Sequence, residues 1–316
     1  MAINITPADL KQSAVKYRKE LLMMIVIALQ SSLKHMTPRL GVQYKEKVGE
    51  IRGNAELGPY DPNRKNTTTD IVGRELEVYL GSVIKEFDPN DVWQSIYGSL
   101  VLQGEGLKNV PITKAILAAE VKSITQKINA ALFSAERNAA GTRSVDLFNG
   151  FDSIAAAEIT AGNVAVAERN LFEFSSVIDG NNAVDALKTY YRAAADELRE
   201  INTKMFISQT IFDAYSDDYQ QTVGAAPYNK EFKKTVLEGS NGLCELVPLA
   251  NKKAGAFIQL TTKGNMLVGM GAGENALEKL EVDRFSAFLV TLSMATVFGV
   301  QYETISPERI LFGKLA

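Results

Sequence analysis

The sequence contains very little of the side-chain chemistry that most enzymes and metal proteins use. Its 316 residues include one cysteine, Cys244, and one histidine, His35. A single cysteine excludes a disulfide within the chain and a cysteine-rich zinc site, and it fits a reducing compartment. A Ser-His-Asp or Cys-His site would have to be built on His35, which lies far from Cys244 in the sequence. We therefore predict no catalytic residue, and interpret His35 as an exposed or packing side chain and Cys244 as a small hydrophobe in a strand.

Long hydrophobic runs and a large excess of charge are also absent. The longest apolar run, from Leu21 to Leu29, is too short for a membrane-spanning helix, which needs about 20 residues. It lies behind Asp9 and Glu20, and no small-residue cleavage site follows it cleanly, so a signal peptide fits poorly. We predict no membrane segment and no export. The net charge of −3 argues against a broad basic face that grips nucleic acid, although a protein can enclose nucleic acid without gripping it.

Two segments have some features of ligand sites but lack the rest. Alternating glycines at 269–273 suggest a phosphate loop, yet no Gly-Lys-Ser/Thr follows them, so we expect a turn at a strand end. A later acidic cluster lacks the glycine turn and the spacing of a calcium loop, and we expect a solvated face there. Its members are Glu274, Glu278, Glu281 and Asp283. The sequence therefore predicts no metal ion and no cofactor.

The most informative feature that is present is the stretch from Pro111 to Gly141. Pro111 suits a first helical turn and Gly141 can end a helix, so the pattern predicts one long helix over 112–139. One side of this helix carries an apolar stripe, and polar residues, among them Lys122 and Asn129, fall mainly on the other side. The stripe recurs at steps of four and three and consists of Leu117, Val121, Ile124, Ile128, Ala131 and Ala135. Such a helix is either a long core helix or a spine to which flanking sheets and loops attach.

The two segments before this helix differ in character. Residues 1–40 combine a basic helix-prone stretch with the apolar run, so they form either an arm that packs on something else or a helix that caps the domain. Residues 41–87 contain two strand-prone limbs around a hydrophilic, turn-rich tip near 58–69. We expect this tip to project, because it cannot bury itself, and a loop of this length is more often functional or disordered than idle.

The chain after the helix predicts an α+β unit followed by strands. The predicted helices cover 183–200 and 208–220, with a strand from Lys204 to Ile207 between them. Glycine and asparagine turns separate three further strands, and a long apolar stretch with many β-formers predicts one or two buried strands. These segments cover 243–249, 256–260, 266–270 and 285–302.

The order of these elements resembles the major capsid proteins of tailed double-stranded DNA phages, which have the Hong Kong 97-like fold. Three stretches carry the resemblance: the long helix running through Ala131–Arg137 into Asp146–Phe151, the strand-then-helix Lys204–Phe212, and Thr261–Gly269 followed by a strand return with Phe285 and Phe288. The resemblance covers most of the chain in organisation more than in exact motif.

The resemblance implies an α+β fold with named subdomains. The implied division is an N-terminal arm at 1–40, an extended loop at 41–87, a peripheral domain at 88–159 with its spine helix at 112–139, an axial domain at 160–270, and strands returning to the peripheral domain at 271–316. It also implies a structural protein without enzymatic activity, located in the virion capsid and assembled in the cytoplasm of a bacterial host. The implied partners are further copies in pentamers and hexamers, a separate scaffolding protein, a portal, and double-stranded DNA enclosed without sequence-specific binding.

Two departures and two alternatives accompany this interpretation. The family often carries a scaffolding segment before the arm, for which this chain has no room, so scaffolding is separate or the sequence is the mature form. Some members cross-link a loop lysine to an asparagine, but Lys45, Lys47 and Lys65 cannot be matched to that role, and no cross-link is predicted.

The first alternative is an encapsulin-like nanocompartment shell around a cargo enzyme. The second is an α/β enzyme, which the shortage of histidine and cysteine disfavours.

Overall fold

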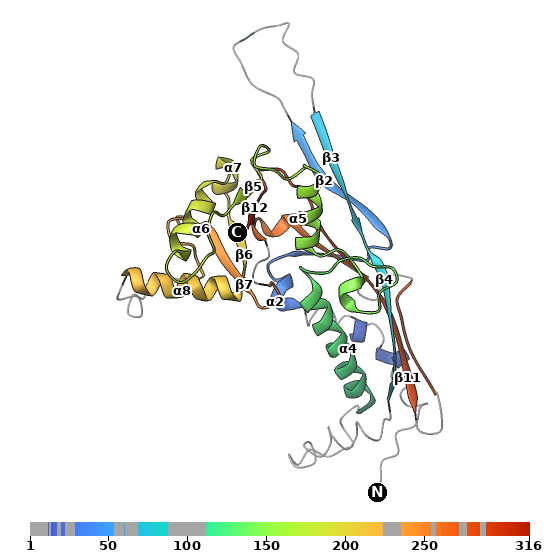
Figure 1. Cartoon of the computed structure of the whole chain (residues 1–316). Coiled ribbons are helices and arrows are strands. Elements are labelled where there is room, and N and C mark those ends of the chain that lie inside the picture. Colours follow the sequence, from blue (N-terminus) through green and yellow to red (C-terminus); the bar gives the residue numbers. More distant parts are fainter. Residues whose placement is uncertain are drawn as a thin grey trace.

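The computed structural model shows a body from which one long hairpin projects (Figure 1). It describes residues 12, 14–17, 20–22, 29–53, 60, 69–87, 112–223, 235–253, 257–271, 277–284 and 289–316. Several predicted features lie outside these ranges. They are most of the apolar run at 21–29, the loop tip near 58–69 except Tyr60 and Thr69, Lys65, residues 88–110, Gly273, Glu274, Phe285 and Phe288.

A five-stranded sheet, here called the central sheet, forms the lower part of the body. Strand β11 is its longest member and pairs antiparallel with β10, β4 and β9, while β1 pairs parallel with β9. The strands are β1 Thr37–Leu40, β4 Tyr79–Phe87, β9 Met266–Met270, β10 Lys279–Arg284 and β11 Val290–Tyr302. Helix α4, Ile112–Ala131, packs on one face of this sheet, and its Glu120 accepts a 2.5 Å hydrogen bond from Lys85 of β4.

Helix α4 confirms the predicted apolar stripe. Ile124 packs against the main hydrophobic cluster, the other four stripe residues of the helix are buried in it, and Ala135, beyond the helix end, is buried there too. Asn129 does not join the exposed polar residues, because it accepts hydrogen bonds from Ser32 and Asn251 at the junction with the N-terminal segment. These contacts hold α2, Gln30–Leu33, against α4.

The helix ends at Ala131, before the predicted end at 139. Beyond this point the backbone carbonyls of Leu132, Phe133 and Ala135 accept hydrogen bonds from N–H groups at 150–152. Those donors belong to the start of α5, Phe151–Thr160, and its preceding glycine. A helical continuation would need the same carbonyls for its own ladder, so the tertiary contact ends the helix and turns Phe133 into the core.

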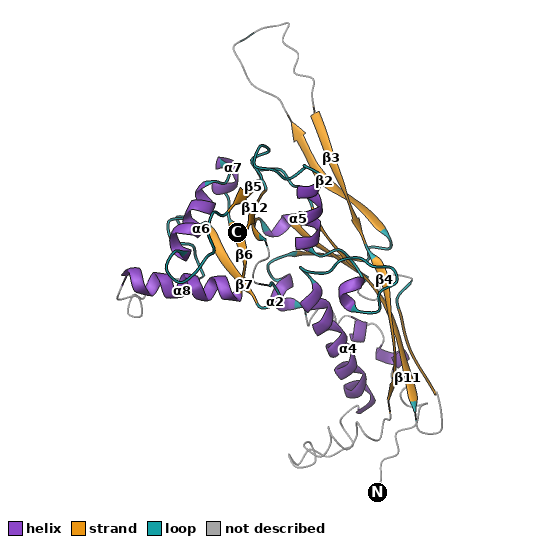
Figure 2. Ribbon diagram, viewed as in Figure 1, coloured by secondary structure: helices purple, strands orange, loops and turns teal. Residues whose placement is uncertain are grey.

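A second five-stranded sheet forms the upper part of the body and is covered by helices (Figure 2). Its strand order is β5-β12-β8-β6-β7, with β5 Leu171–Glu173, β6 Thr203–Ser208, β7 Cys244–Leu249, β8 Ile258–Thr261 and β12 Ile310–Lys314. Side chains on one face belong to the main cluster and those on the other to a second cluster with α6 and α8. The sheet is therefore a shared wall that joins the two halves of the body.

The predicted helix over 183–200 is divided into α6, Ala183–Arg192, and α7, Asp196–Arg199. Ala195 has an extended backbone, with ψ at 149°, which ends the first helix and begins the second. The new first turn carries Asp196 and Glu197, where negative charge is favoured by the helix dipole. The strand and helix that follow agree with the prediction, since β6 covers Thr203–Ser208 and α8 covers Gln209–Val223.

Candidate assembly surface

The projecting hairpin consists of β2, Lys45–Gly53, and β3, Thr69–Glu77, in an antiparallel two-stranded sheet. In the described part of the chain, β2 pairs with no other strand. A two-stranded ribbon is marginally stable alone in water, and its unpaired edges offer backbone groups to another chain. The hairpin therefore has the properties of a surface that is completed by contact with something else.

The base of the hairpin crosses the face of the central sheet that lies opposite α4. At this crossing two glycines are paired across the sheet, Gly269 of β9 and Gly299 of β11. A Cβ atom on Gly299 would lie 2.1 Å from the carbonyl oxygen of Glu77, and one on Gly269 would lie 2.7 Å from Val78. Only glycine permits this close approach of backbone to sheet.

A small hydrophobic cluster and one ion pair fix the base of the hairpin to this face of the central sheet. The cluster consists of Val42, Val48, Leu76, Val78, Leu267 and Val297. The ion pair joins Arg74 of β3 to Glu158 of α5 at 2.5 Å, with side chains 12% and 17% exposed. Arg74 also donates to Gln301 of β11 at 3.2 Å. The orientation of the hairpin is thus set by contacts with two different elements of the body.

Replacing Arg74 by alanine is expected to loosen the hairpin and to lower the free energy of unfolding by about 1–3 kcal/mol, because Glu158 loses a charged partner at a largely buried position. Hydrogen exchange would show faster exchange of the β2 and β3 amides, and denaturant unfolding would give the stability loss. Lys47→Ala, at an exposed position on the same hairpin, is the control and should change neither quantity appreciably. Equal effects of the two variants would contradict the anchoring role of Arg74.

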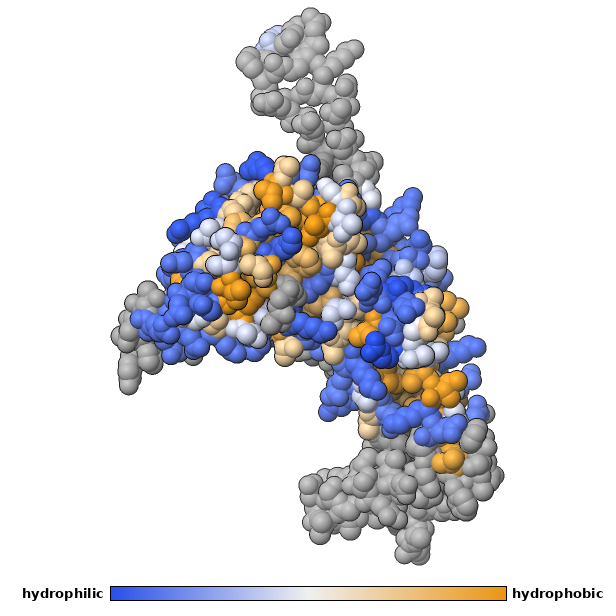
Figure 3. All heavy atoms as spheres, viewed as in Figure 1, coloured by the Kyte–Doolittle hydropathy of each residue, from blue (hydrophilic) through white to orange (hydrophobic). Residues whose placement is uncertain are grey.

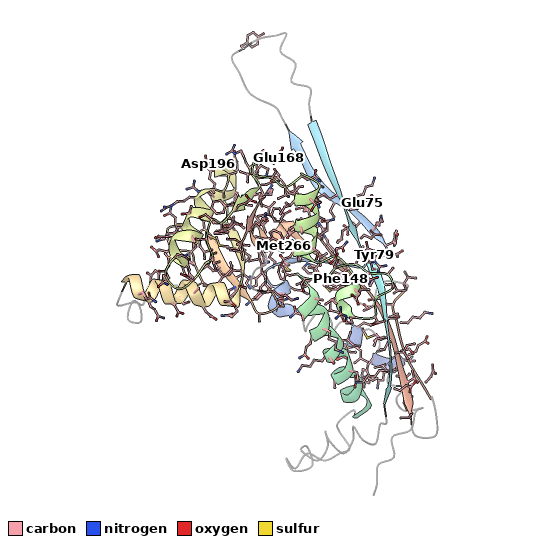
Figure 4. The ribbon with its side chains drawn as sticks, viewed as in Figure 1. Glu75, Tyr79, Phe148, Glu168, Asp196 and Met266 are labelled. Atoms are coloured by element: carbon pink, nitrogen blue, oxygen red, sulfur yellow. The ribbon has the colours of Figure 1, made fainter. Side chains whose placement is uncertain are left out.

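A connected set of aromatic and charged side chains, here called the base patch, lies where the hairpin leaves the body. It consists of Tyr44, Lys45, Glu77, Tyr79 and Arg137. Arg137 lies over the Tyr79 ring at 4.2 Å, the Tyr79 hydroxyl donates to Glu77 at 2.8 Å, and Lys45 lies 3.7 Å from the other Glu77 oxygen. Partial burial, and then the hydrogen bond to Glu77, raise the pKa of Tyr79, which keeps its hydroxyl a donor. Figure 4 shows Tyr79 and the nearby Glu75 at this edge of the body.

A buried polar cluster joins α5 to the upper sheet inside the body. Lys252, whose side chain is 1% exposed, donates to Asp152 of α5 at 2.7 Å, and Gln259 of β8 donates to the same oxygen at 2.6 Å. The Lys252 ammonium also lies 4.4 Å from the centre of the Phe133 ring. Burial lowers the pKa of Lys252, and the Asp152 carboxylate opposes this shift. The arrangement is that of a structural ion pair whose members satisfy each other.

His35 packs between the N-terminal segment and the upper sheet. Its Nδ1 lies 3.3 Å from the Lys204 ammonium and 3.8 Å from Glu245. Burial, and then the charge of Lys204, lower the pKa of His35 to about 4, so the ring is neutral near pH 7. It borders a partly open hollow of about 390 Å³ beside α2, α4 and β7, where Asn129 and Asn251 are bonded to each other.

The folded state should become less stable as the pH falls from about 6.5 to about 4, because the unfolded chain binds a proton at His35 that the folded chain does not. We expect His35→Gln to remove this component, on the order of 1–2 kcal/mol. Denaturant unfolding of both proteins at several pH values between 7 and 4 would measure it. Parallel stability curves for wild type and variant would contradict the assignment.

The remaining sequence candidates are structural in the described residues. Cys244 is buried in β7, and burial raises the pKa of its thiol to about 12, so it is not a reactive thiolate. Glu278 was predicted on a solvated face but is buried and accepts a 2.6 Å hydrogen bond from Thr296, because β10 joins the central sheet. Glu281 and Asp283 are exposed, as predicted. Gly269 lies within β9, and Gly271 follows its end.

Two properties of the described ranges bear on other functions. No group of three histidine, cysteine, aspartate or glutamate side chains converges there as a metal site would require. No helix there is both long enough and apolar enough to cross a bilayer.

Comparison with known proteins rests on structure alone. No protein-family model and no curated protein sequence matches the chain. Its structure is similar to a chain of the satellite phage P4 procapsid, with a TM-score of 0.56 and 11% identity over 92% of this chain and 98% of that chain. It is likewise similar to a chain from the capsid of an empty GTA particle, with a TM-score of 0.54 and 12% identity over 91% and 90% of the two chains. This chain has the phage capsid fold. The expected α+β, Hong Kong 97-like architecture is thereby confirmed.

The capsid fold also occurs in a chain of the holo-SrpI encapsulin complex from Synechococcus elongatus PCC 7942. That similarity has a TM-score of 0.50 and 10% identity, over 90% of this chain and 86% of that chain. The capsid fold alone therefore does not distinguish a phage shell from a nanocompartment shell, and the function must be argued from further observations.

The sequence did not indicate most of the residues that position the hairpin. Arg74 and Glu158 pair across a separation of 84 residues, and neither belongs to a local motif. Gly269 and Gly299 did carry a signal, because a glycine inside a strand pattern often marks a close approach of another backbone. That signal does not identify the approaching segment.

Proposed function

We propose that this chain is the major capsid protein of a tailed phage or prophage, which self-assembles into an icosahedral shell around double-stranded DNA. The observation that carries the proposal is a capsid fold, matched along about nine-tenths of the chain, from which an open-edged hairpin projects. A subunit of a shell needs large repeated contacts with its neighbours rather than a pocket.

The expected division into subdomains becomes part of this proposal. Residues 1–40 form the arm, 41–87 contain the extended loop, 88–159 and 271–316 form the peripheral domain, and 160–270 form the axial domain. The described hairpin covers Lys45–Glu77, and Tyr79–Phe87 pairs with β11 in the central sheet. We therefore place β4 in the peripheral domain and limit the projecting part to residues before Val78.

The proposed partners follow from the shell. Copies of the chain form pentamers and hexamers, a separate scaffolding protein and a portal take part in assembly, and the product is a virion capsid built in the bacterial cytoplasm. The mild net charge of −3 suits a container for DNA, because a strongly basic subunit would hold the packaged phosphates too tightly. The proposed role is structural and involves no catalysis.

The test is electron microscopy and mass photometry of the purified protein over a rising concentration series, with and without a crowding polymer. We expect closed particles tens of nanometres across, or rings of five or six subunits. A monomer under every condition that also resists proteolysis within residues 1–87 would contradict the proposal.

The second candidate is an encapsulin-like shell around a cargo enzyme, which the similarity to the SrpI encapsulin complex supports. The contents of particles recovered from the native host distinguish the two. Nuclease-protected double-stranded DNA supports the phage capsid, and a copurifying folded enzyme without DNA supports the nanocompartment.

A further inference from the structure

The base patch differs from the usual charged surface of a soluble protein because its side chains are held in place. Tyr44 is 62% exposed, but its backbone carbonyl accepts a 2.9 Å hydrogen bond from the Val78 N–H, and the Lys45 ammonium lies 5.7 Å from the centre of its ring. Arg137 is exposed, its backbone N–H donates to Asn149 at 2.9 Å, and its guanidinium is stacked on the Tyr79 ring. Side chains already held in one arrangement lose little conformational entropy when a partner binds.

The composition of the base patch is that of a protein-binding surface. Tyrosine and arginine are the residues, with tryptophan, that most often dominate the energy of protein interfaces. Lys45 contacts both Glu75 and Glu77, at 3.3 and 3.7 Å, so this cation of the patch has two anions beside it. Glu75 and Glu77 would repel the phosphates of a nucleic acid, and the charge-balanced patch fits another protein surface better.

Continuity with the hairpin, together with the proposed shell, favours a second copy of this chain as the partner. The base patch shares Lys45 with β2 and Glu77 with β3, the two strands whose ribbon needs contact with another chain. A partner lying along the ribbon would therefore also cover its base. Figure 3 shows mixed polar and hydrophobic side chains over the described part of the visible face, and hydrophobic residues gather over the lower part of β4 and β11.

We propose that the base patch is a self-association hot spot, where Tyr44 and Arg137 contact a second copy of this chain. The inference rests on the proposed shell function and names residues that carry one of its contacts. In this arrangement Tyr44 supplies buried aromatic area, and Arg137, stacked on Tyr79, supplies a directed donor.

The test compares assembly of the full-length wild type with Tyr44→Ser, Arg137→Ala and the double variant, by mass photometry and electron microscopy over one concentration series. The matched control is Val177→Ser with Arg192→Ala, at exposed positions on the upper part of the body. We expect the double variant to raise the concentration at half-assembly by about tenfold or more, the change that a loss of 1.4 kcal/mol per contact produces. The control should assemble like the wild type.

Melting temperatures of the unassembled proteins separate this effect from misfolding. Because Tyr44 is mostly exposed, Tyr44→Ser alone should leave the melting temperature within about 2 °C of the wild type while weakening assembly. Assembly of the double variant at the wild-type concentration would overturn the hot spot and leave the shell proposal intact. A wild type that stays monomeric and also resists proteolysis within residues 1–87 would overturn both.

Discussion

Replacing Gly299 by alanine is expected to displace the base of the hairpin and to destabilise the protein by about 3 kcal/mol. The added Cβ would lie 2.1 Å from the carbonyl oxygen of Glu77 and 3.1 Å from the Cα of Val78, both of which are backbone atoms. Backbone cannot rotate away as a flexible side chain can, so either β11 or the hairpin base must shift. We place the cost at the upper end of the roughly 1–3 kcal/mol that overpacking usually incurs.

Gly73→Ala provides a matched control on the same hairpin. A Cβ at Gly73 would have nothing within 4 Å, and alanine there should cost little. Denaturant unfolding of the two variants would measure stability, and hydrogen exchange of β2 and β3 would report the position of the hairpin base. If Gly299→Ala unfolds like Gly73→Ala and leaves hydrogen exchange of the hairpin unchanged, the proposed close contact between β11 and the hairpin base is wrong.

The close contact at Gly299 should also affect assembly if the hairpin meets a neighbouring subunit in one fixed direction. A shift at Gly299 would change that direction without altering any residue of the hairpin itself. We therefore expect Gly299→Ala to impair particle formation more than Gly73→Ala does. This comparison links a local backbone contact to the geometry of the whole shell.

The spine helix was the part of the fold that the sequence predicted best, because its evidence is local. A stripe at steps of four and three over five turns has few interpretations other than a buried helical face. The end of the helix depended instead on hydrogen bonds from Gly150, Phe151 and Asp152 to carbonyls more than a dozen residues earlier. No pattern within 112–139 contains that information.

The hairpin shows the same division between local and non-local information. Two polar, strand-prone limbs around a turn-rich tip were enough to predict two strands within 41–87, and β2 and β3 lie there. The point where projection stops is set by the pairing of Tyr79–Phe87 with β11, which lies about 200 residues later. The sequence predicts a solvated face for Glu278 for a similar reason. Glu278 is buried only because β10 pairs with β11, and no local pattern indicates that pairing.

The largest effect in the interior is expected from Lys252→Met, at about 3–5 kcal/mol, because it leaves the Asp152 carboxylate buried without its cation. Asp152 would keep the Gln259 hydrogen bond and the favourable first turn of α5, which limits the loss but does not replace the charge. The neighbouring Lys253 is exposed, so Lys253→Met removes the same charge at the surface and should change stability by less than about 0.5 kcal/mol.

A double-mutant cycle decides whether the loss comes from the pair or from each residue alone. Asp152→Asn combined with Lys252→Met removes both charges and keeps similar volumes, so it should regain most of the stability that Lys252→Met loses. The two single variants together would then predict a larger loss than the double variant shows, by at least about 1.5 kcal/mol. Additive losses would mean that Lys252 and Asp152 act independently. Because the pair joins α5 to the turn after β7, coupling would show that charge pairing holds α5 against the upper sheet.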